Sequence, residues 1–202
     1  RSSGGNVSSH VIKDSNRGVT KEIYPNATTA EGTSSLIDGF LTDGFSINNT
    51  ANEHYNYNNG LYVSWQWKCN AGTTSTNSDG TVNTTMQLNS TAGFSIITWT
   101  GAGNNTSTAG HGLGAIPDCI IVKGREANAN WSVAFPKFET SKLLGLNLTS
   151  AFFSASGLSS YNTSTFVDGS GSASEDYIAY CFKAVQGYSK FGSYTGNGNA
   201  DG

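Results

Sequence analysis

Apolar and polar residues alternate strictly in two stretches of the chain, residues 62–68 and residues 177–183. A period of two places successive side chains on opposite faces of an extended backbone, so each stretch predicts a β-strand with one buried face. The side chains predicted for the structural core are Val63, Trp65 and Trp67 in the first stretch and Ile178, Tyr180 and Phe182 in the second.

The same two stretches match each other residue by residue in size and in the face that each side chain takes, which indicates an internal repeat. Other segments match in the same order along the chain, and they pair residues 23–30 with 144–151 and residues 93–104 with 187–199. Chance composition is a poor explanation for matches that keep their order, and an internal duplication is a better one. We therefore expect both alternating stretches to bury equivalent side chains.

Strands separated by Gly- and Asn-rich turns, with almost no helix signal, predict an all-β fold. The expected architecture is an antiparallel β-sandwich, of jelly-roll or lectin-like type, in internally duplicated units. Residues 1–92 form a first, partial unit that ends in a linker from about residue 70 to residue 92. Residues 93–192 form a second, complete unit, and residues 193–202 begin a further unit or add a terminal strand.

One part of the second unit has no counterpart in the first. Residues 110–114 (Gly-His-Gly-Leu-Gly) lead into residues 116–123, an apolar run typical of a central strand that is buried on both faces. Two explanations stay open. The chain was cut from a longer repeat protein, or the first unit takes its missing strand from elsewhere by strand addition.

The amino-acid composition argues against some classes of binding partner. Charged residues make up 12% of the 202 residues, against roughly 25% in ordinary soluble domains, so uncharged Ser, Thr, Asn and Gly must supply the solubility. The net charge of −3 and the scattered basic residues argue against a nucleic acid partner. No window approaches 18 consecutive apolar residues, so we expect no membrane insertion.

Candidate catalytic chemistry is sparse. The three cysteines do not form Cys-x-x-Cys pairs, the three histidines lack metal-ligand spacing, and we expect no metal, no cofactor and no catalytic residue. His111, between glycines before the central strand, is expected to make a structural hydrogen bond. Asp14 and Arg17 are close enough in sequence to pair, and we expect them to be solvated or turn-forming. The chain is therefore not expected to be an enzyme.

Aromatic residues beside Asn and Ser clusters are the best candidates for ligand binding. Sugars stack an apolar face on an aromatic ring, while amides and hydroxyls meet their hydroxyl groups. The alternative is that these rings cap the core. The candidate glycan-binding residues are Tyr55, Tyr57, Asn58, Trp131 and Tyr161.

The chain also resembles a known family. The motifs that carry the resemblance are residues 9–18, residues 93–95 with Thr-Gly-x-Gly at 100–103, residues 110–114, residues 117–123, and residues 177–183 with 187–198. They are similar to a tandem-repeat β domain of unassigned function in large virion and tail-fibre-like structural proteins of marine, cyanophage-type bacteriophages. The chain departs from that pattern in Trp65-Gln66-Trp67 and in the spacer at residues 70–91. That family has no established catalytic residues, so none is carried over.

The resemblance implies a location on the virion surface or outside the cell. It implies a tail-fibre or surface-appendage segment that attaches to host-surface glycans, forms a homo-oligomer and contacts other virion or filament subunits. The alternative is a structural spacer, capsid decoration or filament subunit without a ligand. A third reading, a glycan-degrading enzyme, would need paired carboxylates in a cleft.

Overall fold

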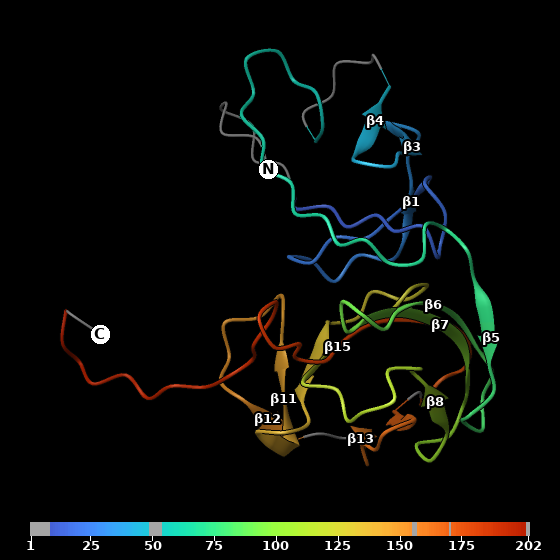
Figure 1. Cartoon of the computed structure of the whole chain (residues 1–202), viewed down its shortest axis with the longest axis vertical. Coiled ribbons are helices and arrows are strands. Elements are labelled where there is room, and N and C mark those ends of the chain that lie inside the picture. Colours follow the sequence, from blue (N-terminus) through green and yellow to red (C-terminus); the bar gives the residue numbers. More distant parts are fainter. Residues whose placement is uncertain (1–8, 49–53, 155–156, 170, 201–202) are drawn as a thin grey trace.

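The computed structural model describes residues 9–48, 54–154, 157–169 and 171–200, and this part of the chain is all β, without helices. An eight-stranded antiparallel sheet, curved in Figure 1, dominates it in the order β12-β11-β10-β9-β15-β7-β6-β5. Its strands are β5 (Ser75–Asn77), β6 (Thr84–Asn89), β7 (Phe94–Ala102), β9 (Cys119–Gly124), β10 (Ser132–Phe135), β11 (Glu139–Gly145), β12 (Phe153–Ser154) and β15 (Ala173–Phe182).

Three smaller antiparallel sheets accompany the large one. The first is three-stranded, in the order β13-β14-β8, and the others are the hairpins β1-β2 and β3-β4 near the N-terminus. Their bounds are β8 (Thr108–Gly110), β13 (Leu158–Ser159), β14 (Thr165–Asp168), β1 (Lys21–Glu22), β2 (Gly32–Thr33), β3 (Ile37–Phe40) and β4 (Phe45–Ile47).

Strand β15 lies at the centre of the large sheet and is paired on both edges. Tyr177 lies opposite Trp99 of β7 and opposite Gly124 of β9, and the ladders continue to Phe182. Ile178 is fully buried and Tyr180 is 7% exposed, which confirms the core prediction for this strand. Phe182 is partly buried and packs against the same cluster.

Each face of the large sheet has its own core, because successive side chains of a strand point to opposite faces. On one face, Ile97 and Trp99 share a cluster with Phe166 of β14. On the other face, Ile96 shares a cluster with Ile23 of the N-terminal segment. In Figure 1 this segment (blue) accordingly lies on one side of the sheet, with β8 and β13 on the other.

The apolar run before Lys123 becomes strand β9, between β10 and β15, with buried residues on both faces. The prediction of a central strand is thus confirmed. Cys119 and Cys181 are buried and Cys69 is half-buried, and all three are free thiols, as expected of small apolar side chains.

The prediction that residues 62–68, the first alternating stretch, form a strand with one buried face is wrong. Residues 62–68 form no strand, and Val63, Trp65 and Trp67 are 56%, 68% and 56% exposed. An alternating sequence becomes a buried strand only where neighbours pair its backbone and cover its apolar face. Here the ring of Trp67 lies edge-on to Phe182 at 6.4 Å, and the Lys68 carbonyl accepts a hydrogen bond from the Asn89 side chain of β6, but no strand pairs with the stretch. The twin stretches lie in unlike surroundings, so their burial lends the duplication no support.

The prediction of a linker from about residue 70 to residue 92 is also wrong. This stretch contains β5 and β6, which extend the large sheet from β7, with Met86 opposite Ile97. The Thr84 hydroxyl is buried and donates a hydrogen bond to the Gly110 carbonyl at 2.9 Å. Thr and Asn content indicated a loop, but these residues alternate and pair at the end of the sheet.

Substituting Gly80 tests whether the former linker is part of the fold. A Cβ at this position would lie 2.1 Å from the backbone oxygen of Thr108, so the turn before β6 would have to move away from β8. We expect Gly80→Ala to lower the free energy of unfolding by about 1–3 kcal/mol in urea titration. Gly44→Ala is the control, since nothing lies within 4 Å of its Cβ. Equal stability of the two variants would contradict the packing of this turn.

Candidate functional site

The structure does not bring the five predicted glycan-binding residues together. Trp131 is fully buried, and its Nε1 donates a hydrogen bond to the Tyr24 carbonyl at 2.9 Å. Tyr161 is half-buried, donates to the Leu158 carbonyl, and packs against the core on the opposite face of the sheet. The prediction is wrong for Trp131, because a ring enclosed by the core offers no face to a sugar.

The other three candidates lie in one part of the sequence, but only two of them are exposed. The Tyr55 hydroxyl donates a 2.8 Å hydrogen bond to Glu22, and burial together with this carboxylate raises the pKa of Tyr55. Lys13 lies over the Tyr55 ring at 5.8 Å. Tyr57 and Asn58 are exposed, and their role in binding stays a prediction.

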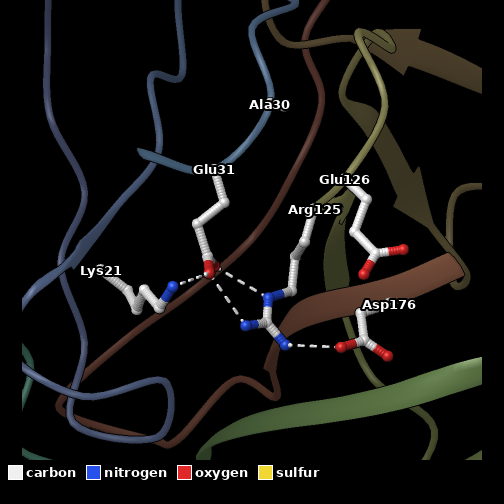
Figure 2. A pocket seen from close by; sticks show the side chains of 6 residues that line it. All are labelled: Lys21, Ala30, Glu31, Arg125, Glu126 and Asp176. Carbon is white, nitrogen blue, oxygen red and sulfur yellow. Dashed lines mark hydrogen bonds and ion pairs between the residues drawn. The ribbon is translucent and has the colours of Figure 1, made fainter. Parts of the chain in front are cut away.

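A polar pocket of about 310 Å³ lies where the N-terminal segment meets the end of β9 (Figure 2). Arg125, which follows β9, grips Glu31 with two hydrogen bonds, from Nε at 2.8 Å and from Nη2 at 2.9 Å. Its Nη1 lies 3.6 Å from the carboxylate of Asp176 on β15. The residues that line the pocket are Lys21, Ala30, Glu31, Arg125, Glu126 and Asp176.

The same carboxylate continues into a buried ion network. Glu31 accepts a 3.1 Å hydrogen bond from Arg17, whose side chain is fully buried and also donates to Asp14 at 2.6 Å. The Tyr180 hydroxyl of β15 donates to Asp14 at 2.7 Å. Burial would lower the pKa of Arg17, but Tyr180 and Asp14 outweigh it and raise that pKa above its ordinary value.

Asp14 and Arg17 form a turn, as expected, but the expectation that they are solvated is wrong because both side chains are buried. Their spacing of three residues did indicate a pair, and the Arg17 backbone N–H also donates to Asp14. The sequence gives no sign of burial, because the covering residue, Tyr180, lies on a strand at the far end of the chain. The network holds the N-terminal segment to the sheet through charges that are paired with one another, which indicates a structural role.

His111 also has a structural role, as predicted. Its Nδ1 accepts a hydrogen bond from the Leu113 backbone N–H, and its Nε2 lies 3.2 Å from the Asn162 carbonyl. The ring is fully buried beside Phe166, and burial lowers the pKa of His111, which favours the neutral ring.

Within the described residues, no group of three or more His, Cys, Asp or Glu side chains is placed to hold a metal ion. The same part of the chain contains no helix with the length and apolar character needed to span a bilayer.

The surface feature that stands out is residues 57–67, which we name the aromatic segment. It is extended after a turn in which the Gly60 N–H donates to the Tyr57 carbonyl, and the Tyr57 N–H donates to the Tyr62 hydroxyl. Its exposed apolar residues are Tyr57, Leu61, Tyr62, Val63, Trp65 and Trp67. Contiguous exposed apolar side chains of this kind mark binding surfaces. The alternation in the sequence pointed to Val63, Trp65 and Trp67 but assigned them to the core.

Acid should weaken the ion network before it disturbs the apolar core. Burial would raise the pKa of Glu31, but hydrogen bonds from Arg125 and Arg17 outweigh it and lower that pKa below its ordinary value of 4.5. A carboxylate with a lowered folded-state pKa stabilises the fold above its unfolded pKa. It loses this effect as the pH falls through the folded value.

We expect Glu31→Gln to lower the free energy of unfolding at pH 7 by about 3 kcal/mol, because it leaves Arg17 and Arg125 underpaired. The difference from the wild type should shrink as the pH falls below about 4.5 in urea titrations. Glu126→Gln, an exposed carboxylate of the same pocket, should change stability by less than about 0.5 kcal/mol. A Glu31 variant with the same pH profile as the wild type would contradict this assignment.

Comparison with known proteins adds a family but no function. No curated protein and no solved structure matches the chain. The matching family model is described only as a domain of unknown function, so the resemblance to virion proteins stays a prediction. That model covers residues 3–202, and the chain therefore belongs to the DUF7483 family.

Proposed function

We propose that this chain is a structural subunit of a phage virion surface assembly, such as a tail fibre or appendage, and that it binds other subunits through the aromatic segment. The observation that supports a binding role is the exposure of Trp65 and Trp67 in a segment whose sequence alternates like that of a strand. Trp and Tyr are the residues most enriched at the energetic centres of protein interfaces. The virion assignment itself comes from the sequence resemblance.

The composition and the fold are in keeping with this role. A surface of uncharged polar residues and a β framework suit a structural part outside the cell or on the virion. We interpret the large sheet and the three-stranded sheet, which share one core cluster, as a jelly-roll-like sandwich. A subunit of this type needs no catalytic cleft, so we propose a non-enzymatic function.

Self-association tests this function. We expect sedimentation velocity runs on the purified chain to show assemblies that grow with concentration. The double variant Trp65→Ser/Trp67→Ser should weaken association by about 2 kcal/mol or more, roughly thirtyfold in Kd. The double variant Phe138→Ser/Leu146→Ser, which removes two exposed apolar side chains elsewhere, is the control and should associate like the wild type. A wild-type chain that stays monomeric at every concentration would contradict the proposal.

Attachment to host-surface glycans is the second candidate function. Tyr57 is 45% exposed, and the exposed amides of Asn58 and Asn59 follow it, which is the combination of ring and amide that sugars bind. Single contacts of this kind are weak, but several copies on one particle could raise avidity roughly 10²–10⁴-fold.

A panel of bacterial lipopolysaccharides and capsular polysaccharides tests this candidate. We expect at least one of them to bind the chain in surface plasmon resonance, and Tyr57→Ala/Asn58→Ala to reduce the affinity about tenfold or more. Phe138→Ala, another exposed aromatic position, is the control and should bind like the wild type. An undiminished response from the Tyr57/Asn58 variant would move the glycan site elsewhere.

A further inference from the structure

The partner of the aromatic segment can be sought in the chain's own strand pairing. Residues 62–67 match residues 177–182 of β15 in the size of the side chains and in the face that each side chain takes. Within the chain, β15 pairs with β7 over a long antiparallel ladder. Because residues 62–67 resemble β15, we expect them to pair well with a strand that resembles β7.

The chain contains a second segment like β7, at residues 187–199. It begins with Gly-Tyr-Ser, as the β7 region begins with Gly-Phe-Ser, and both continue into an aromatic residue, Thr and Gly. The backbone conformation is also similar at two glycines of each segment. Gly187 and Gly198 have φ of 78° and 77°, close to the 65° and 74° of their counterparts Gly93 and Gly103.

Residues 188–195 of this C-terminal segment are the part proposed to accept a strand. Ser189 pairs with Val185 in a tight turn, as the start of β7 pairs with β6, and its other edge faces away from that turn. No strand of the described chain pairs with residues 190–200. Tyr188 is 64% exposed and Tyr194 is 94% exposed.

The two segments have almost none of the residues that normally protect an open strand. Natural edges are guarded by charges or proline, which prevent pairing with another chain. Residues 55–67 contain no Asp, Glu, Lys, Arg or Pro, and residues 188–195 contain one such residue, Lys190. Because residues 62–67 carry no charge, Lys190 meets no like charge and no electrostatic repulsion opposes the pairing.

We propose that residues 62–67 of one copy add as an antiparallel strand to residues 188–195 of a second copy, in the arrangement of β15 on β7. This inference rests on the proposed function and names the partner. By equivalence with Ile178 opposite Thr98, Val63 lies opposite Ser193. The C-terminal segment has one more residue than β7 before this point, which a β-bulge absorbs.

A second copy is the proposed partner because the two segments are not paired with each other within one copy, although the rings of Trp67 and Phe191 both lie near Phe182 there. In Figure 1 the aromatic segment (teal) and the C-terminal segment (red) extend from different sides of the molecule. The proposed contact joins two different surfaces, so each bound copy still offers one free segment at either end. Repetition of such a contact produces a ring or an open filament, which suits a fibre or appendage subunit.

Disulfide trapping tests both the partner and the register. One chain carries Val63→Cys and the other Ser193→Cys, both on a Cys69→Ser background that removes the half-buried thiol. Mild oxidation of the mixture is expected to give a disulfide-linked heterodimer on non-reducing gels. Replacing Ser193→Cys by Gly192→Cys is the control, because the neighbouring side chain points to the opposite face. The control should give at least tenfold less heterodimer.

The outcomes separate the inference from the proposed function. Equal trapping at positions 192 and 193, or no trapping while the wild type still associates, would overturn the inference and leave the aromatic segment as an interface. A single chain with both Val63→Cys and Ser193→Cys that cross-links only within itself would also overturn it. A wild type that never associates would overturn both. Loss of the cross-link in the Trp65→Ser/Trp67→Ser background, with native circular dichroism, would support both.

Discussion

The whole structure depends on the enclosure of β15. This strand is paired with β7 along one edge and β9 along the other, and side chains on both of its faces are buried. On one face lies the core shared with the three-stranded sheet, and on the other lies the core shared with the N-terminal segment. Removal of any of these four neighbours would leave apolar side chains or backbone groups of β15 in water, so the flanking elements are tied to a common centre.

The charges around Arg17 belong to the same constraint. A buried ion pair contributes little net stability, because taking both charges out of water costs about as much as their attraction returns. Its effect is on geometry, since a misplaced Arg17 would be a buried charge without a partner. The hydrogen bond from Tyr180 to Asp14 connects this requirement to β15, so the N-terminal segment can settle on the sheet in only one way.

The comparison of the two alternating stretches shows how far a sequence can predict this fold. Alternation correctly identified Ile178 and Tyr180 as buried, and the apolar run at β9 correctly predicted a strand enclosed on both faces. The same alternation failed at Trp65, because periodicity records what a strand would bury and not whether neighbours are there to bury it. One available sign was that the first unit lacks a counterpart of residues 110–123, the part that supplies β9.

The candidate site was less predictable for the same reason. Trp131 and Tyr57 both stand beside Asn residues in the sequence, yet one ring is enclosed by the core and the other is exposed. Local composition cannot separate them, since the residues that cover Trp131 come from the N-terminal segment, about a hundred positions away.

The exposure of the aromatic segment therefore calls for a physical explanation and not only a correction. An uncharged, extended stretch with two exposed tryptophans promotes association, and natural β proteins usually blunt such edges with charges or proline. The aromatic segment has no such residue, and residues 188–195 have a single one, Lys190. The aromatic segment has side chains like those of the buried strand β15, but nothing in its own chain buries them. This is explained if another polypeptide supplies the neighbouring strands. The cost of exposing Trp65 and Trp67 in one chain then becomes part of the free energy that holds two chains together.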